Sequence, residues 1–317
     1  MKAIAIDDYG SVDQLHTCER PEPRPQADEV LVRVRAASVN PVDWKIREGQ
    51  LRLLLHPKFP YIPGGDIAGE VVAAGPEAGS FKAGDAVVGF MDLRRGGGYA
   101  EFAAPKAAAV ALKPPSLSFI EAATLPIAGC TALRGLRDAG KLTAGASVLI
   151  LGGAGGVGHF TVQISKALGA KTTATCGPSN IDFVRSLGAD RVICYTTTDV
   201  MAQPDRYDLV FDTVATSSFP ACRQILAPGG IYVTTLPGPG LLFWSAVQSI
   251  AGIFGKAKRA KMVVVRPNGR DIAFLCALAR DGKLKPHISL TLPLDRAAEA
   301  QQASKAGHSR GKIVLEC

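Results

Sequence analysis

The chain has 317 residues and a formal net charge of +8; hydrophobic residues make up 47% of it and charged residues 20%. This length suffices for two domains with real cores, and the balance is that of a globular protein, not of a disordered one. The positive charges are scattered, and the densest group, Lys256 to Lys261, has no nucleic-acid motif beside it. We therefore expect no nucleic-acid partner; a phosphorylated small ligand accounts equally well for the basic excess.

Cysteine usage and apolar segments bear on the compartment. The seven cysteines are dispersed and form no C-x-x-C pair, which favours free thiols in a reducing environment. The N-terminus has an early acid, Asp7, and no long apolar core, so it is not expected to be a signal peptide. The apolar stretch 241–255 is too short to span a bilayer and is expected to be a buried or interface helix. These observations predict a cytoplasmic protein with no integral membrane segment.

The first third of the chain reads as β-structure. Residues 30–36 alternate between apolar and polar, and short apolar runs at 67–75 and 85–90 follow. Proline- and glycine-rich turns separate them, as at Pro63-Gly64-Gly65. Short strands with regular turns predict a compact, barrel-like domain.

The middle of the chain changes to alternating strands and helices. A helical pattern covers 118–140, and the apolar run 148–151 leads into a glycine-rich segment and a further helix to about residue 169. The next strands are expected at 171–176, 191–195, 207–212 and 230–235. Mostly apolar strands separated by helices indicate a parallel sheet covered on both faces.

The last fifth of the chain shows helical patterns at 271–281 and 295–305, with strand-like segments at 287–293 and 311–316. If the final segment returns to pair with the first domain, the α/β part becomes an insertion between two pieces of one β domain.

The glycine-rich segment carries the clearest motif. It fits G-x-G-x-x-G between a buried strand and a helix, which is the context that the dinucleotide-binding fingerprint requires. Gly153 would make the tight turn, Gly155 would admit the pyrophosphate, and Gly158 would let helix and strand pack closely. The free N–H groups of the helix N-terminus would bind the phosphates. The alternative is a loop whose glycines serve packing alone. The motif comprises Gly153, Ala154, Gly155, Gly156, Val157 and Gly158.

The end of the second strand bears on the choice between NAD and NADP. NAD-binding proteins place an Asp or Glu about 20 residues beyond the fingerprint to hold the ribose hydroxyls. Here residues 175–180 read Thr-Cys-Gly-Pro-Ser-Asn, with no carboxylate to repel a 2′-phosphate. NADPH is therefore the expected cofactor. Ser179 is equally natural as a helix N-cap, and it could fill both roles.

Together these segments resemble the medium-chain dehydrogenase/reductase superfamily, in its zinc-independent quinone oxidoreductase branch. The resemblance extends over nearly the whole chain and is specific only in combination. It implies a GroES-like β-barrel catalytic domain (1–118 and 268–317), a Rossmann domain with a doubly wound parallel sheet (119–267), and a homodimer. The segments that carry it are 40–45, 63–71, 97–102, 122–126 and 131–132.

The zinc ligands of the superfamily's alcohol dehydrogenases are missing from this chain. Asn40 to Asp43 contains no Cys, Gly65-Asp66 offers no His, and the four-Cys lobe is absent. Zinc needs three or four converging N, S or O ligands. We therefore expect no metal, and each of the five histidines is expected to be a surface or satisfied residue.

The resemblance places residues 40–45 near the nicotinamide. Asn40 could donate to a substrate carbonyl or hold the ribose, and Lys45 could polarise an oxygen or contact phosphate; a turn and a solvated charge are their structural alternatives. Asp43 adds a polar group there, and Tyr61 and Tyr99 are candidates for pocket lining or proton donation. The expected catalytic residues are Asn40, Asp43, Lys45 and Tyr61. Beyond the fingerprint, the expected cofactor contacts are Thr131, Cys176, Ser179, Asn180 and Tyr195.

Three functions stay open on the sequence. The first is hydride transfer from NADPH to a quinone without zinc. The second is NADPH-dependent reduction of the double bond of α,β-unsaturated carbonyls, such as enones, alkenals and γ-ketols. The third is a non-catalytic NADPH-binding protein. A small-molecule quinone or enone is the expected partner in the first two.

Overall fold

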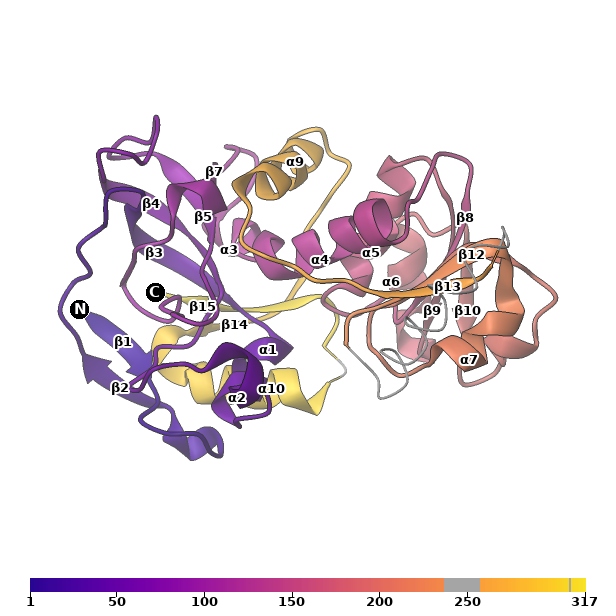
Figure 1. Cartoon of the computed structure of the whole chain (residues 1–317), viewed down its shortest axis with the longest axis horizontal. Helices are drawn as coiled ribbons and strands as arrows, with labels where there is room; N and C mark the ends of the chain where they lie inside the picture. Colours follow the sequence, from indigo (N-terminus) through magenta and orange to yellow (C-terminus); the bar gives the residue numbers. More distant parts are fainter. Residues whose placement is uncertain (237–256, 308) are drawn as a thin grey trace. The chain divides into compact units, whose positions relative to one another are not determined.

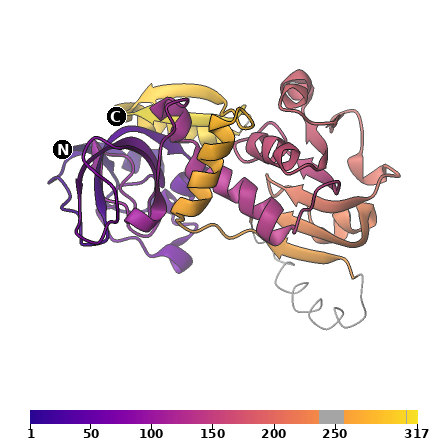
Figure 2. The ribbon, with the colours of Figure 1, turned by 90° about the horizontal axis from the view of Figure 1, so that it is seen from above.

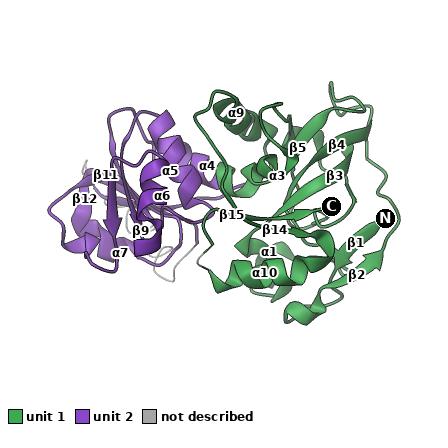
Figure 3. Ribbon diagram, turned by 180° about the vertical axis from the view of Figure 1, so that it is seen from behind, with its two compact units in different colours: residues 1–130, 266–317 green, residues 131–265 purple. Residues whose placement is uncertain are grey.

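The structure is a computed structural model of the chain and describes residues 1–236, 257–307 and 309–317 (Figure 1). It divides into two compact units, of which unit 1 comprises residues 1–130 and 266–317 and unit 2 comprises residues 131–265 (Figure 3). The interface helix expected at 241–255 lies outside the described residues. Among those described, no helix is long and apolar enough to cross a membrane.

Unit 2 is built on a six-stranded parallel sheet with the order β10-β9-β8-β11-β12-β13. Numbered from the first strand of the unit, this is the order 3-2-1-4-5-6 of the doubly wound nucleotide-binding fold. The chain reverses direction across the sheet between β8 and β11, where such folds bind their ligands. The strands are β8 (Ser147–Leu151), β9 (Lys171–Cys176), β10 (Arg191–Cys194), β11 (Tyr207–Asp212), β12 (Leu226–Thr234) and β13 (Arg259–Met262).

The helices of unit 2 follow from the apolar pattern between the strands. Helix α5 contacts β8 and β9, α6 contacts β9 and β10, and α7 contacts β12. The apolar run of β8 is buried from Val148 to Leu151, as expected for a strand in the middle of a covered sheet. The helices are α4 (Cys130–Arg134), α5 (Gly158–Ala167), α6 (Ile181–Ser186) and α7 (Phe219–Cys222).

Unit 1 is built on a mainly antiparallel sheet with the order β14-β15-β3-β4-β5-β7, in which β6 also pairs with β3. A separate antiparallel pair joins β1 and β2. The strands are β1 (Lys2–Ala5), β2 (His16–Glu19), β3 (Val30–Val39), β4 (Asp66–Ala74), β5 (Ala86–Phe90), β6 (Phe102–Ala103), β7 (Val110–Leu112), β14 (Ile288–Pro293) and β15 (Lys312–Glu316). The helices are α1 (Pro41–Arg47), α2 (Arg52–Leu55), α3 (Phe119–Ala122), α9 (Gly269–Arg280) and α10 (Ala297–Ala306).

The two ends of the chain meet in the sheet of unit 1. Strand β15 pairs antiparallel with β3, with Ile313 opposite Val39, which confirms that the last strand returns to the first domain. The α/β unit is therefore an insertion in the β unit. Figure 2 follows the chain out of β13 through residues 263–268 into α9; unit 1 resumes within this connection, at Arg266.

The boundary between the units lies after residue 130, whereas the sequence placed it after residue 118. The helical pattern of 118–140 is real but broken, because π-helical turns at Leu125–Gly129 and Gly135–Ala139 interrupt it. The first of these turns belongs to unit 1. The Ile127 N–H donates to the Asp66 carboxylate at 2.8 Å, and a Cβ on Gly129 would lie 2.9 Å from Leu275. These tertiary contacts, and not the local helical pattern, decide to which unit the segment belongs.

Candidate functional site

The connection from β8 to α5, residues 152–158, is here called the glycine loop; its glycines have different neighbours. A Cβ on Gly158 would lie 2.0 Å from the Gly152 carbonyl oxygen, and one on Gly153 would lie 2.9 Å from the Ala174 Cβ. Among the described residues other than its two chain neighbours, a Cβ on Gly155 would meet only the Gly152 carbonyl oxygen, at 3.6 Å, which is an ordinary contact. Gly153 and Gly158 are therefore needed for packing, whereas Gly155 has room that a ligand's phosphates can use.

The tight turn starts at Gly152 and has Gly153 as its second residue, since the Gly155 N–H donates to the Gly152 carbonyl oxygen at 3.2 Å. Gly152 has φ +82°, in the left-handed region that favours glycine, whereas Gly153 is not among the residues with positive φ. The sequence pattern shows only that the glycines are spaced correctly; the backbone conformation shows that Gly152 is the residue that needs the left-handed region.

The glycine loop is held by side chains that the sequence did not single out. Gly152 N–H donates to Thr175 Oγ1 at 3.1 Å, and Gly153 N–H donates to the Thr175 carbonyl at 2.8 Å. The Gly155 carbonyl oxygen lies 3.0 Å from both the backbone N–H and the ring Nδ1 of His159. Because a carbonyl only accepts, Nδ1 must carry a proton toward it. His159 is fully buried, and its ring has a hydrogen-bond partner in the Gly155 carbonyl. The sequence could have indicated this contact, because His159 follows Gly155 by four residues, on the first turn of α5.

The segment after β9 begins beside the residue that holds the glycine loop, because Thr175, near the end of β9, accepts hydrogen bonds from that loop. Cys176 is buried at the strand end, Ser179 is exposed, and Asn180 is the N-cap of α6. The alternative role of Ser179 as the helix cap is therefore wrong. Beyond the acid-free stretch, the first carboxylate is that of Asp182, which is 95% exposed and pairs with Arg185 at 2.8 Å.

The two remaining expected cofactor contacts differ in exposure. Thr131 is buried in α4, whereas Tyr195 is 59% exposed just beyond β10. Tyr195 lies beside the segment after β9, because a Cβ on Gly177 would come 3.1 Å from its hydroxyl. The Tyr195 hydroxyl thus lies close to Gly177, which comes shortly before Ser179 and Asn180 in the chain.

A buried set of polar residues in unit 1, here called the polar cluster, consists of Ser38, Asn40, Asp66 and Lys312. Asp66 accepts hydrogen bonds from Ser38 Oγ at 2.6 Å and from Asn40 Nδ2 at 2.8 Å. Lys312 Nζ donates to Asn40 Oδ1 at 2.5 Å and to the Val39 carbonyl at 3.1 Å, and it lies 4.0 Å from Asp66 Oδ2. All four side chains are at most 3% exposed. The cluster is therefore a buried ion pair with its hydrogen bonds largely made.

The polar cluster changes the interpretation of Asn40. Its Nδ2 also lies 3.3 Å from the Ser38 carbonyl, so both amide hydrogens and the amide oxygen have buried partners. A side chain held in this way does not donate to a substrate carbonyl. Asn40 instead fixes the start of α1, where it is the N-cap and Pro41 is the first helical residue. Sequence reasoning missed Lys312, because nothing in the final strand marks a lysine as buried.

Asp43 lies in the first turn of the same helix, α1. Its Oδ2 accepts from the Asn40 backbone N–H at 2.8 Å and from the Tyr99 hydroxyl at 2.9 Å. Among the described residues, its Oδ1 has no hydrogen-bond partner. Burial raises the pKa of the Asp43 carboxyl to about 7, and the nearby Asp66 adds to the rise. The same burial raises the pKa of Tyr99. Asp43 is therefore a buried acid whose protonation changes near neutral pH.

Lys45 and Tyr61 differ in their exposure. Lys45 is half-buried with its Nζ 5.4 Å from the centre of the Trp44 ring, and partial burial lowers the pKa of its ammonium group. Tyr61 is 2% exposed, and its hydroxyl donates to the Leu93 carbonyl at 2.8 Å. The interpretation of Tyr61 as a proton donor is not supported by this geometry. Of the four expected catalytic residues, Lys45 alone offers a polar group that is not enclosed.

The potential metal ligands do not converge in the part of the chain that the structure describes. No three His, Cys, Asp or Glu side chains there come together in a way that could hold a metal ion. At the superfamily's zinc-ligand motif, Gly65 leaves no imidazole and the Asp66 carboxylate is engaged in the polar cluster.

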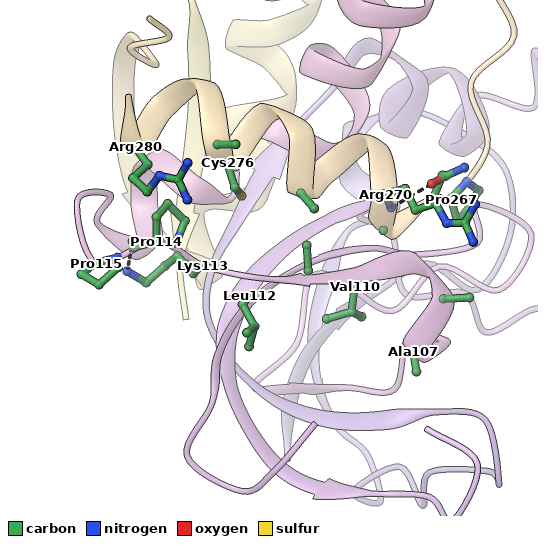
Figure 4. A pocket seen from close by; sticks show the side chains of 16 residues that line it. Ala107, Val110, Leu112, Lys113, Pro114, Pro115, Pro267, Arg270, Cys276 and Arg280 are labelled. Carbon is green, nitrogen blue, oxygen red and sulfur yellow. Dashed lines mark hydrogen bonds between the residues drawn. The ribbon is translucent and has the colours of Figure 1, made fainter. Parts of the chain in front are cut away.

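A groove of about 1040 Å³ lies between β7 and α9 in unit 1. Figure 4 shows Lys113 and Arg280 toward one end of it and Arg270 at the other. None of the expected site residues lines this groove. Lys113 turns its ammonium group to the carbonyls of Pro114 and Leu117, at 3.1 and 2.5 Å. The groove is thus distinct from both the glycine loop and the polar cluster.

Comparison with known proteins gives consistent matches over the whole chain. Residues 26–115 match the alcohol dehydrogenase GroES-like domain, and residues 187–315 match the zinc-binding dehydrogenase family. The chain is 38% identical to the chloroplast envelope quinone oxidoreductase homolog of Arabidopsis thaliana, over 100% of this chain and 98% of that protein. It is 34% identical to the chloroplastic NADPH-dependent alkenal/one oxidoreductase of the same plant, over 99% of this chain and 79% of that protein.

A solved structure adds the fold. The quinone oxidoreductase from Coxiella burnetii superposes with a TM-score of 0.87 at 32% identity, over 100% of this chain and 99% of that one. Unit 1 is accordingly the GroES-like domain and unit 2 the Rossmann-like domain, as the sequence predicted. The chain belongs to the medium-chain dehydrogenase/reductase superfamily, among its quinone oxidoreductase-like members.

Proposed function

We propose that this protein is an NADPH-dependent oxidoreductase that delivers hydride to a quinone without zinc. The observation that carries the proposal is the open position at Gly155, in a glycine loop at the point where the strand order of unit 2 reverses. The quinone oxidoreductases among its relatives support the reaction type.

The glycine loop fits a dinucleotide. Its packing glycines keep the start of α5 close to β8, and the hydrogen bonds of Thr175 and His159 hold the loop in shape. Gly155 to Gly158 would cradle the pyrophosphate, for which the N-terminus of α5 offers free N–H groups. When bound, NADPH would supply the hydride, while the chain supplies orientation and electrostatics.

The preference for NADPH over NADH rests on the segment after β9. Residues 175–180 bring hydroxyl and amide groups and no carboxylate, and Ser179 is exposed. We propose that Ser179, Asn180 and Tyr195 form the subsite for the adenosine 2′-phosphate. The absence of a charge that would repel the phosphate is the supporting argument.

The residues of unit 1 would orient the substrate. Helix α1 begins at Pro41, directly after its N-cap Asn40, and the polar cluster together with Asp43 fixes that beginning. We propose that Asn40 and Asp43 are positioning residues and that Lys45 is the group that polarises the substrate oxygen. A lysine that is partly stripped of water interacts more strongly with an oxygen that gains negative charge.

Zinc is not needed for this chemistry, since reduction of a quinone spreads the developing charge over a conjugated system. Two observations support a zinc-free reaction: the Asp66 carboxylate is hydrogen-bonded within the polar cluster, and Gly65 provides no imidazole. We also propose a homodimer, which sedimentation would test.

The experiment is NADPH oxidation, followed by absorbance, against quinones, 2-alkenals and long-chain γ-ketols. Turnover of quinones above the other classes supports the proposal. Turnover of alkenals or enones instead would favour double-bond reduction, the second candidate, which the alkenal/one oxidoreductase among the relatives supports. Tight NADPH binding without any turnover would favour a non-catalytic binding protein.

A further inference from the structure

Strands β9 and β10 both end on a cysteine. In the parallel register of these neighbours, Cys194 is the partner of Cys176, just as Val192 is the partner of Ala174. Residues in register on neighbouring strands point to the same face of a sheet. The two thiols therefore lie side by side on one face of the sheet of unit 2.

The spacing of the two cysteines suits a disulfide. Neighbouring strands run about 4.8 Å apart, and disulfides join Cα atoms that are about 4.4–6.8 Å apart. The Tyr195 N–H donates to the Cys176 carbonyl at 3.2 Å, which keeps the two strand ends together. Each cysteine is the last residue of its strand, so a small rotation can bring the sulfurs closer without breaking the ladder behind them.

The two thiols have different surroundings. Cys176 is 2% exposed, and burial raises the pKa of its thiol, with a further contribution from Cys194. Cys194 is partly exposed, and its Sγ lies 3.2 Å from Thr196 Oγ1. This hydrogen bond lowers the pKa of the Cys194 thiol. Cys194 is therefore the accessible nucleophile and Cys176 the enclosed partner.

We propose that Cys176 and Cys194 form a reversible disulfide when the protein meets a low-molecular-weight disulfide. The Cys194 thiolate attacks that disulfide, one S–S bond breaks as another forms, and one small thiolate leaves. The Cys176 thiolate then attacks the Cys194 sulfur and expels the second small thiolate. In sum the two cysteines lose two electrons and two protons, and the small disulfide gains them as two thiols.

The disulfide would act on the subsite next to it. Gly177 follows Cys176 directly. The Tyr195 hydroxyl lies close to Gly177, 3.1 Å from where a Cβ on that glycine would be. Drawing the two strand ends together moves Tyr195 against Gly177, where the segment assigned above to the 2′-phosphate begins. Oxidation is therefore expected to weaken NADPH binding about tenfold; this consequence rests on the proposed function, whereas the disulfide does not.

The test uses the reduced full-length chain, treated with oxidised glutathione, blocked by alkylation and digested. We expect a peptide pair joined through Cys176 and Cys194, which dithiothreitol separates. The pair should persist in Cys18→Ser/Cys317→Ser, which removes the partly exposed cysteines of unit 1, and it should vanish in Cys194→Ser and in Cys176→Ser. Separate alkylation or glutathionylation of the two cysteines, with no joined peptide, would overturn the proposal.

Fluorescence titration with NADPH before and after oxidation separates the two proposals. Weaker binding after oxidation, restored by dithiothreitol and absent in Cys194→Ser, supports the coupling. A joined peptide with unchanged NADPH affinity would refute the coupling and leave the disulfide standing. A reduced protein that does not bind NADPH would refute the proposed function, whatever the peptide map shows.

Discussion

The glycine loop of unit 2 and the polar cluster of unit 1 are built in opposite ways. The loop is a single short stretch of chain whose shape comes from missing side chains. The cluster joins Ser38 and Asn40 to Asp66 and, across most of the sequence, to Lys312. In the loop, Gly153 and Gly158 are required for packing, whereas Gly155 is the glycine that leaves room for a ligand. In the cluster, the polar atoms that orient the start of α1 also serve as hydrogen-bond partners for buried neighbours. The position of α1 and the stability of unit 1 therefore depend on the same contacts.

This difference predicts that a mutation in the loop can abolish cofactor binding without lowering stability, whereas a mutation in the cluster cannot change one property without the other. The largest effect is expected at Gly155. Gly155→Val should lower NADPH affinity at least about 100-fold, because the side chain would fill the space assigned to the pyrophosphate. The melting temperature of the variant should change little, since the nearest atom to the added Cβ beyond its chain neighbours in the described part of the chain, the Gly152 carbonyl oxygen, is 3.6 Å away. Fluorescence titration and thermal unfolding measure the two quantities.

Gly158→Val is the matched control for that variant. Its Cβ would lie 2.0 Å from the Gly152 carbonyl oxygen, so we expect a loss of unfolding free energy on the order of 3 kcal/mol or more. Normal NADPH binding in a folded Gly155→Val protein would show that the loop is not the cofactor site.

The next largest effect is expected at Lys312. Lys312→Met leaves the Asp66 carboxylate buried without its cation, which typically costs about 3–5 kcal/mol of stability. The double variant Lys312→Met/Asp66→Asn removes both charges and should recover most of this loss. Urea unfolding of the two variants checks this. A single variant as stable as the unchanged protein would show that the ion pair does not stabilise unit 1.

Asp43 predicts a pH dependence. Its pKa rises from an ordinary value of 3.8 to about 7 in the folded protein. Between these values the folded state binds more protons than the unfolded state, so this group lowers the unfolding free energy as pH rises from about 4 to 7. The loss is complete above about pH 7 and is at most on the order of 4 kcal/mol.

The variant Asp43→Asn removes that titration. Its stability relative to the unchanged protein should increase between pH 5 and pH 8, with both measured by chemical denaturation. A stability difference that is constant over this range would mean that Asp43 is ionised throughout.

A smaller effect is expected at the segment after β9. Ser179→Asp places a carboxylate near the 2′-phosphate and should weaken NADPH binding about tenfold while leaving NADH binding nearly unchanged. Parallel titrations with both cofactors measure the selectivity. If the affinities for NADPH and NADH change equally, the 2′-phosphate does not bind beside Ser179.

The smallest effect is expected from metal removal. Incubation with a chelator should leave the proposed quinone reduction unchanged, because Gly65 offers no imidazole and the Asp66 carboxylate is engaged in the polar cluster. Elemental analysis of the purified protein is the accompanying measurement, and one zinc per chain together with loss of activity on chelation would contradict this expectation.

The sequence by itself determined the parts of the protein that depend on local pattern. The strands from β8 to β12, the glycine spacing, the acid-free end of β9 and the strand-like final segment all follow from residues that lie close together in the chain, whereas β13 (Arg259–Met262) was not predicted. Period and turn chemistry suffice there, because parallel strands buried on both faces are apolar throughout and a phosphate loop needs glycines at set intervals.

Only the tertiary structure decided the rest. It gave the left-handed conformation to Gly152, kept residues 119–130 with unit 1, and enclosed Asn40 and Tyr61 where the sequence suggested groups that face a substrate. It also brought Lys312 to Asn40 from the far end of the chain. The physical reason is that hydrogen-bond partners and burial arise from contacts between distant segments, and such contacts leave no periodic trace in the sequence.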